Sequence, residues 1–252
     1  RSTLFPYTTL FRSQPLKEKL TNDVNYFGTM LVFTDKVGGL VSGAIHSTGD
    51  TVRPALQIVK TKPEYNKVAG CFILRKGEEV YLFADGGVNL DPSAEDLAET
   101  AIQTAETAKK FGIDPKVAML SFSTMGSASS DEVTKVQEAT KLAKEKAPAL
   151  DIDGELQFDA AFVPEVAALK APDSKVAGKA NVFIFPNLAA GNIGYKLVQR
   201  LGGFAAIGPL LQGLNAPIND LSRGCNEKDV YELAIVTAAE VEIGRASCRE
   251  RV

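Results

Sequence analysis

The stretch Asn181–Asp229, NVFIFPNLAAGNIGYKLVQRLGGFAAIGPLLQGLNAPINDLSRGCNEKD, decides the fold class of this 252-residue chain. It opens on a continuous apolar run, Val182–Phe185, passes through glycine-punctuated residues 191–196, and reaches a second apolar run near Ala205–Leu211. It ends in a dense polar turn at residues 219–224. Continuous apolar runs are typical of parallel strands covered on both faces, and open α/β proteins bind ligands in polar turns at strand ends. We therefore predict an α/β fold with a ligand site in this stretch.

Strand-like and helix-like segments alternate along the rest of the chain, which favours parallel sheets linked by helical crossovers. The predicted strands are Thr29–Phe33, Leu40–Ala44, Val68–Leu74, Val80–Ala84, Val117–Phe122, Leu156–Phe162 and Val182–Phe185. Capping patterns and apolar spacing predict the helices. One runs from a Ser93/Asp96 cap to Gly112, one from Ser130 to before Pro148, one after a Gly191–Gly194 turn, and one from Asn226 to about Glu240.

Two polar, proline-containing links, Lys60–Lys67 and Gly213–Asn219, are predicted to connect two domains. Residues 14–66 plus 212–243 would form an incomplete first α/β domain, and residues 67–211 would form a second. A cleft would lie between them.

Both ends of the chain differ from the body in composition. Residues 1–13 and 244–252 resemble translated sequencing adaptors, and we expect them to be foreign tails rather than natural disordered termini. They hold five arginines and one glutamate, so removing their +4 from the formal −3 leaves about −7 on the body. An acidic body disfavours a nucleic-acid surface.

Other classes of protein are also disfavoured. No apolar run approaches the roughly 18–20 residues of a membrane span. The body retains two cysteines, Cys71 and Cys225, which fits a reducing cytoplasm rather than a disulfide framework. With His46 as the only histidine, we expect no metal site.

The first candidate site is Ser222-Arg223-Gly224 followed by Asp229. Arginine offers a rigid fork of donors for phosphate or carboxylate, and serine offers a hydroxyl. Asp229 also lies three residues after Asn226, the spacing of a helix capping box. Capping and a chemical role can coexist, since a helix N-terminus favours anions.

Two weaker candidates are polar segments that follow predicted strands. His46–Pro54, with Thr48 and Arg53, has the strand–loop–helix order of a phosphate cradle, although a solvated loop fits equally well. Ser121–Ser130, with Ser127, suits an anion or a pantetheine-like chain, or a linker that ends in a helix cap.

Seven short runs, in order along nearly the whole body, strongly resemble phosphate acetyltransferase. They are Leu40–Ala44, Arg53–Gln57, Leu120–Thr124, Asp153–Gln157, Ala177–Asn181, Gly191–Lys196 and Asp220–Gly224. The resemblance implies two α/β/α domains like those of isocitrate and isopropylmalate dehydrogenases, with mainly parallel sheets and the site in the cleft between them. It also implies a cytoplasmic homodimer that transfers acetyl between coenzyme A and phosphate. Coenzyme A is then a substrate, and no tightly bound cofactor, metal, nucleic acid or membrane is expected.

The resemblance assigns roles to individual residues. Ser222 and Arg223 match the family's active-site pair, Asp229 matches its proposed base, and Arg53 matches a phosphate-contacting arginine. Thr48 falls where a serine often stands, and Ser127 is a further substrate-binding candidate. Phe83–Gly87 lacks the usual cysteine and Lys36–Gly39 lacks an expected aspartate, so neither receives a role. The family also continues upstream of Tyr26 with a basic segment, which predicts that this chain is a fragment.

The implied reaction is direct attack of the coenzyme A thiolate on the acetyl carbonyl of acetyl phosphate. Arg223 and Arg53 would neutralise developing charge, Ser222 would hydrogen-bond the reacting centre, and Asp229 would take the thiol proton. Reference pKa values of a thiol and an aspartate differ by ~4.6 units, or roughly 6 kcal/mol. The transfer therefore needs a desolvated carboxylate, a thiol acidified by Arg223, or both.

Two alternatives remain at this point. The chain would act on butyryl or another short acyl group if its pocket were larger. It would be a non-catalytic acyl-coenzyme-A sensor if it resembled the related module of some malic enzymes, although the retention of Ser222, Arg223 and Asp229 together argues against this.

Overall fold

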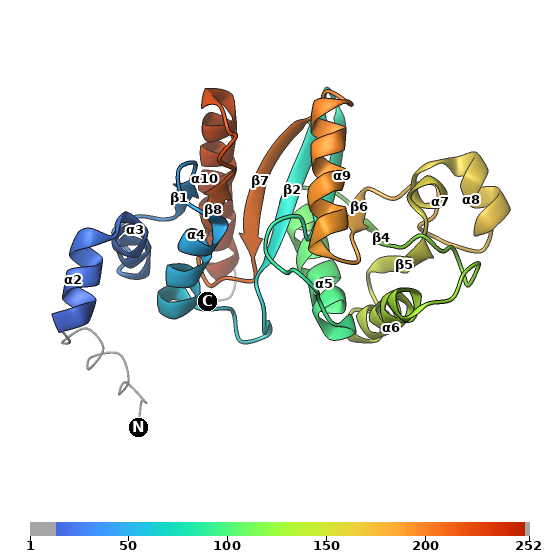
Figure 1. Cartoon of the computed structure of the whole chain (residues 1–252), viewed down its shortest axis with the longest axis horizontal. Helices are drawn as coiled ribbons and strands as arrows, with labels where there is room; N and C mark the ends of the chain where they lie inside the picture. The colour runs from blue at the N-terminus through green and yellow to red at the C-terminus, as the bar shows by residue number, and fades with distance from the viewer. Residues whose placement is uncertain (1–13, 250–252) are drawn as a thin grey trace.

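The computed structural model describes residues 14–249, and within them the protein is built on one eight-stranded sheet flanked by helices (Figure 1). The strand order across the sheet is β1-β8-β7-β2-β3-β6-β4-β5. The strands are β1 (Leu40–Gly43), β2 (Ala69–Lys76), β3 (Glu79–Ala84), β4 (Lys116–Leu120), β5 (Asp151–Leu156), β6 (Val182–Ile184), β7 (Ala205–Gln212) and β8 (Ile218–Leu221). The predicted mixed α/β class is confirmed, with a single sheet in place of the separate sheets expected.

The sheet contains two parallel wings that run in opposite directions. The two-strand wing consists of β1 and β8, and the four-strand wing consists of β3, β6, β4 and β5. The long strands β2 and β7 join the wings by three successive antiparallel pairings, β8 with β7, β7 with β2 and β2 with β3. The carboxyl ends of the two wings therefore lie at opposite edges of the sheet.

Helices cover both faces of the sheet. They are α2 (Gln14–Asn22), α3 (Val24–Phe33), α4 (Thr48–Pro54), the π-helix η1 (Ala55–Val59), α5 (Ala94–Lys110), α6 (Asp131–Lys146), α7 (Phe158–Phe162), α8 (Pro164–Lys170), α9 (Leu188–Arg200) and α10 (Glu227–Arg249). Helices α5, α6 and α10 contribute to one core, α7, α8 and α9 contribute to a second, and α3 and η1 contribute to a third. Figure 1 shows α5 and α9 on opposite sides of the central strands.

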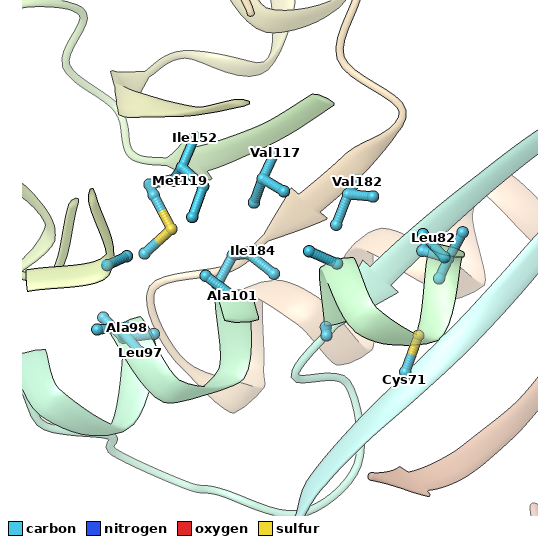
Figure 2. Packing of buried hydrophobic residues seen from close by; sticks show 14 of the residues in the cluster. Cys71, Leu82, Leu97, Ala98, Ala101, Val117, Met119, Ile152, Val182 and Ile184 are labelled. Atoms are coloured by element: carbon cyan, nitrogen blue, oxygen red, sulfur yellow. The ribbon is translucent and has the colours of Figure 1, made fainter. Parts of the chain in front are cut away.

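The first core lies between the sheet and helix α5. Small alanines on one face of α5, including Ala98 and Ala101, let the helix approach the strands closely. Figure 2 shows these alanines facing Val117, Val182 and Ile184 of the parallel strands. The continuous apolar runs seen in the sequence are thus the strands covered on both faces.

Two predicted strands are wrong in the same way. Thr29–Phe33 belongs to helix α3, which begins after Asp23, whose carboxylate accepts hydrogen bonds from the amides of Asn25 and Tyr26. Leu156–Phe162 is divided between the end of β5 and helix α7. Short runs of apolar residues suit either element, because packing rather than intrinsic preference decides between them.

Three boundaries in the second half of the chain also differ from prediction. The Gly191–Gly194 segment lies inside α9, which begins after the Asn187 cap, and does not form a turn before it. Residues 219–221 of the predicted polar turn form most of strand β8. Helix α10 continues to Arg249 instead of ending near Glu240, while the predicted tail at residues 1–13 lies outside the described residues.

The two predicted links lie side by side. Thr61 pairs with Leu214, and the amide of Lys62 donates to the Gly213 carbonyl at 2.9 Å. The Asn215 side chain donates to three carbonyls of residues 59–61. Close to these links, β7 and β8 are joined by a single residue pair. This is the smallest number of paired residues between any two neighbouring strands of the sheet.

Within residues 14–249, no helix is both long enough and apolar enough to span a bilayer.

Candidate functional site

A pocket of about 310 Å³ lies where the two-strand wing meets β7, β2 and α9. Its walls come from four places along the chain that the fold brings together. They are Phe72 of β2, the α9 residues Tyr195, Lys196, Gln199 and Arg200, Ala206 and Gly208 of β7, and Leu221, Ser222, Gly224, Cys225 and Asp229. Two of the residues predicted to be catalytic, Ser222 and Asp229, therefore line the same pocket.

The last wall is the loop from β8 into helix α10. Asn226 and Asp229 form a reciprocal capping box, in which the Asp229 amide donates to Asn226 Oδ1 at 3.1 Å and the Asn226 amide donates to Asp229 Oδ2 at 2.9 Å. The predicted helix start is confirmed. Because capping engages Oδ2 alone, it is compatible with a second role for the carboxylate. The loop also points the N-terminal end of a long helix toward the pocket, which favours an anion there.

The facing wall supplies positive charge. Lys196 and Arg200 lie four residues apart on α9, so both side chains project from the same face of the helix, and both line the pocket. Lys196 Nζ donates to Asn192 Oδ1 at 2.6 Å. Both side chains are exposed, as suits residues that meet a charged ligand from solvent.

The base of this wall is aromatic and rigid. The rings of Phe72 and Tyr195 stack with their centroids 3.8 Å apart. Burial raises the pKa of the Tyr195 hydroxyl, an effect that the charge of Arg200 partly offsets. Tyr195 therefore remains protonated and presents a hydrogen-bond donor at neutral pH.

Thr48, Arg53 and Arg223 do not line this pocket. Thr48 lies at the start of α4, where its hydroxyl donates to Asp220 Oδ2 at 2.7 Å. The Arg53 side chain is 62% exposed and reaches Asp50 at 4.0 Å. Arg223 is exposed beside Ser222 in the loop itself. All three follow the carboxyl ends of β1 and β8, so they belong to the same edge of the sheet as the pocket.

Ser127 lies elsewhere in the molecule. It follows β4, and its hydroxyl accepts a hydrogen bond from the Thr124 amide at 3.0 Å. Four strands separate β4 from β8 in the sheet order, a span of about 24 Å at roughly 4.8 Å per strand. The wings also run in opposite directions, so the structure does not bring Ser127 together with Ser222.

Sequence reasoning missed the cations of α9 and Tyr195. Lys196 ends the glycine-punctuated run with no signal of its own, and Arg200 sits near the end of a helix with no distinctive spacing. A helical projection would have found them, since Lys196 and Arg200 lie on one face and follow a glycine-rich segment.

Within the described residues, no group of three or more histidine, cysteine, aspartate or glutamate side chains is arranged to hold a metal ion. The fold and the pocket define an α/β protein with a site for an anionic ligand, in which a hydroxyl and a carboxylate face two cations.

The comparisons with known proteins agree with this description. A family model for phosphate acetyl/butaryl transferase matches residues 12–238. The phosphate acetyltransferase of Bacillus subtilis (strain 168) is 66% identical over 218 residues, which cover 86% of this chain and 68% of the relative. The crystal structure of a phosphotransacetylase from Streptococcus pyogenes is 62% identical, with a TM-score of 0.85, over 89% of this chain and 69% of that one.

The chain belongs to the phosphate acetyl/butaryl transferase family. The 4-hydroxythreonine-4-phosphate dehydrogenase of Klebsiella pneumoniae shares its fold at 10% identity and a TM-score of 0.50, over 88% of this chain and 68% of the dehydrogenase. The predicted family and the dehydrogenase-like fold are thus confirmed.

Proposed function

We propose that this protein transfers an acetyl group reversibly between coenzyme A and phosphate, with the pocket described above as its site. The observation that carries the proposal is that Ser222 and Asp229 share one pocket with the cations Lys196 and Arg200. Its support from relatives is the 66% identity to a protein named phosphate acetyltransferase. Coenzyme A is a substrate in this proposal, and no tightly bound cofactor takes part.

The chemical step is a direct displacement. The thiolate sulfur of coenzyme A attacks the acetyl carbonyl carbon of acetyl phosphate, a carbon–sulfur bond forms, and the carbon–oxygen bond to phosphate breaks. The thiol proton passes to Asp229, and inorganic phosphate leaves with the bonding electron pair. In reverse, a phosphate oxygen attacks the thioester carbonyl and the thiolate departs.

The surrounding charges make both directions feasible. Positive side chains near the pocket, Lys196, Arg200 and Arg223, favour the thiolate over the thiol and so reduce the uphill proton transfer to a carboxylate. The Ser222 hydroxyl stabilises the oxyanion that develops on the carbonyl. Arg53 and Thr48, which lie on the same sheet edge as the pocket, are proposed as substrate contacts, whereas Ser127 lies at the opposite edge of the sheet.

The test is phosphate-dependent release of coenzyme A from acetyl-CoA, followed with a thiol reagent. Asp229→Asn keeps the shape of the cap but removes the base, and we expect turnover to fall by about 10²–10⁴. Asp96→Asn is the matched control, because Asp96 occupies the same position in the capping box of α5, where its Oδ2 accepts from the Ser93 amide at 3.0 Å. That control should keep turnover within about twofold.

Three results would overturn the proposal or one of its steps. If the unmodified protein released no coenzyme A with phosphate present, the assigned reaction would be wrong. If Asp229→Asn turned over as fast as Asp96→Asn, Asp229 would not be the base. An acetyl group trapped on Ser222 or Cys225 by mass spectrometry would replace direct transfer with a covalent intermediate.

We further propose a homodimer, a cytoplasmic location and the two-domain division given above. Exposed apolar side chains at four-residue spacing, Ile193 and Leu197 on α9 and Leu201 at its C-cap, offer a surface for a second copy. The free cysteines Cys71 and Cys225 suit a reducing compartment. The division falls where β7 and β8 share a single residue pair, and the pocket takes its walls from both sides of that junction. Light scattering in solution tests the dimer.

A further inference from the structure

The most deeply buried carboxylate near the site takes no part in the mechanism above. Asp220 is the third residue of β8, two residues before Ser222, and is 1% exposed. Its Oδ2 accepts from the Thr48 hydroxyl at 2.7 Å, and its Oδ1 accepts from the Thr51 hydroxyl at 2.9 Å. Both threonines lie on one face of α4, three residues apart. A single side chain thus joins segments that are far apart in the sequence.

The backbone at the end of β1 packs closely against Asp220. Gly43, at the end of β1, pairs with Leu221, and a Cβ atom at Gly43 would lie 2.5 Å from Asp220 Oδ1 and 2.4 Å from the Leu221 carbonyl oxygen. Its φ of +91° is in the region that favours glycine. The turn from β1 into α4 therefore runs directly against the carboxylate.

We propose that Asp220 is a positioning residue: it fixes helix α4, which carries Thr48 and Arg53, against the loop after β8. The inference rests on the proposed function where it concerns phosphate. Asp220 would then connect α4 with the loop after β8, the two segments that carry the proposed substrate contacts. Asp220 itself touches no substrate.

The hydrogen bonds also restrict what Thr48 can do. A threonine hydroxyl has one proton to donate and two lone pairs, and Thr48 gives its proton to Asp220. It cannot then donate to a phosphate oxygen, so it contributes to phosphate binding by holding Arg53 in place or by accepting a hydrogen bond from a protonated phosphate oxygen. Burial raises the pKa of Asp220, and the hydrogen bonds from the Thr48 and Thr51 hydroxyls and from the Leu221 backbone oppose that rise.

Hydrogen exchange tests the positioning directly and without reference to catalysis. Asp220→Ala removes both hydrogen bonds, and we expect the amides of residues 48–53 to exchange at least about tenfold faster, since both bonds are made to one buried carboxyl group. Thr48→Val removes one of the two bonds and should accelerate the same amides less, and Thr48→Ser should leave their exchange unchanged. Adding Thr48→Val to Asp220→Ala should change exchange little, because Asp220→Ala already removes that bond. If Asp220→Ala does not fold, the Thr48→Val and Thr48→Ser pair carries the test.

Titration calorimetry with inorganic phosphate and, separately, coenzyme A supplies the second readout. We expect Thr48→Val to weaken phosphate binding about tenfold and to leave coenzyme A binding within twofold. Glu99→Ala is the control, because Glu99 is also buried and accepts from the amides of Asn66 and Lys67 far from α4.

The outcomes separate the two proposals. Unchanged exchange at residues 48–53, or equal acceleration by Glu99→Ala, would overturn the positioning role. Equal weakening of phosphate and coenzyme A would overturn its link to phosphate. If phosphate did not bind the unmodified protein, the proposed function would fail while the exchange result still decided the role of Asp220.

Discussion

A methyl group added at Gly191 of α9 has two opposite effects on stability. It crowds the packing of α9 against the sheet, and it raises the intrinsic helix propensity of that position. A Cβ atom at Gly191 would lie 2.1 Å from the Asp85 carbonyl oxygen and 3.0 Å from its carbon. An ordinary contact begins near 3.4 Å, so α9 and the end of β3 must move apart by more than 1 Å or distort. Overpacking against backbone costs about 3 kcal/mol, and replacing glycine by alanine inside a helix returns about 1 kcal/mol. We expect Gly191→Ala to lower the free energy of unfolding by about 2 kcal/mol.

Gly194→Ala is the matched variant in the same helix. Its Cβ would meet the ring of Phe185 at 2.9 Å, and a partly exposed side chain can move where a carbonyl cannot. The helix gain then offsets the contact, and stability should change by less than about 0.5 kcal/mol. Urea unfolding followed by circular dichroism measures the free energy of unfolding of both variants. In thermal unfolding, Gly191→Ala should lower Tm by about 4–8 °C. Equal stability of the two variants would refute the packing argument.

Three further predictions concern α10. Leu233→Ala should destabilise the protein by about 2–5 kcal/mol in urea unfolding, because Leu233 is fully buried in the first core; a loss below 1 kcal/mol would mean that the site collapses around the smaller residue. Asn226→Ala should cost about 1 kcal/mol through loss of the cap, and a second substitution at Asp229 should add less than its separate effect. Burial raises the pKa of Glu240, and this effect exceeds the lowering by Asn219, Lys110 and Lys62. The contribution of Glu240 to stability is therefore present at low pH and is lost as pH rises through its folded-state pKa. Glu240→Gln should therefore gain stability relative to the unmodified protein at pH 8 but not at pH 4, and the reverse trend in unfolding free energy would contradict the raised pKa.

Local signals predicted the parts of the fold that local chemistry decides. The Ser93/Asp96 and Asn226/Asp229 capping boxes lie where the sequence places them, because a cap is complete within four residues. The same residues could not reveal that Asn219 and Asp220 are buried. Polar side chains inside a strand look like a turn unless their partners are known, and here the partners come from α4 and α10.

The candidate site was predictable in part for the same reason. Ser222 and Asp229 share one loop and helix start, so their spacing carries the information. Lys196 and Arg200 reach the pocket only through the pairing of β7 with β2 and the packing of α9 on both, which no short motif records. The position of Ser127 depends on the opposite directions of the two wings, a property of the whole sheet order.

The two-strand wing also determines when the site can exist during folding. Its register pairs Leu40 with Ile218, so β1 and β8 meet only after nearly the whole intervening chain has been brought into a closed loop. Pairings that close long loops are entropically costly and slow to form. The four-strand wing closes shorter loops and can condense first. The edge that carries Thr48 and Ser222 is therefore expected to be the last part of the sheet to assemble. A ligand that bridges this edge would make its contacts only after the folding transition state, so it should stabilise the protein mainly by slowing unfolding.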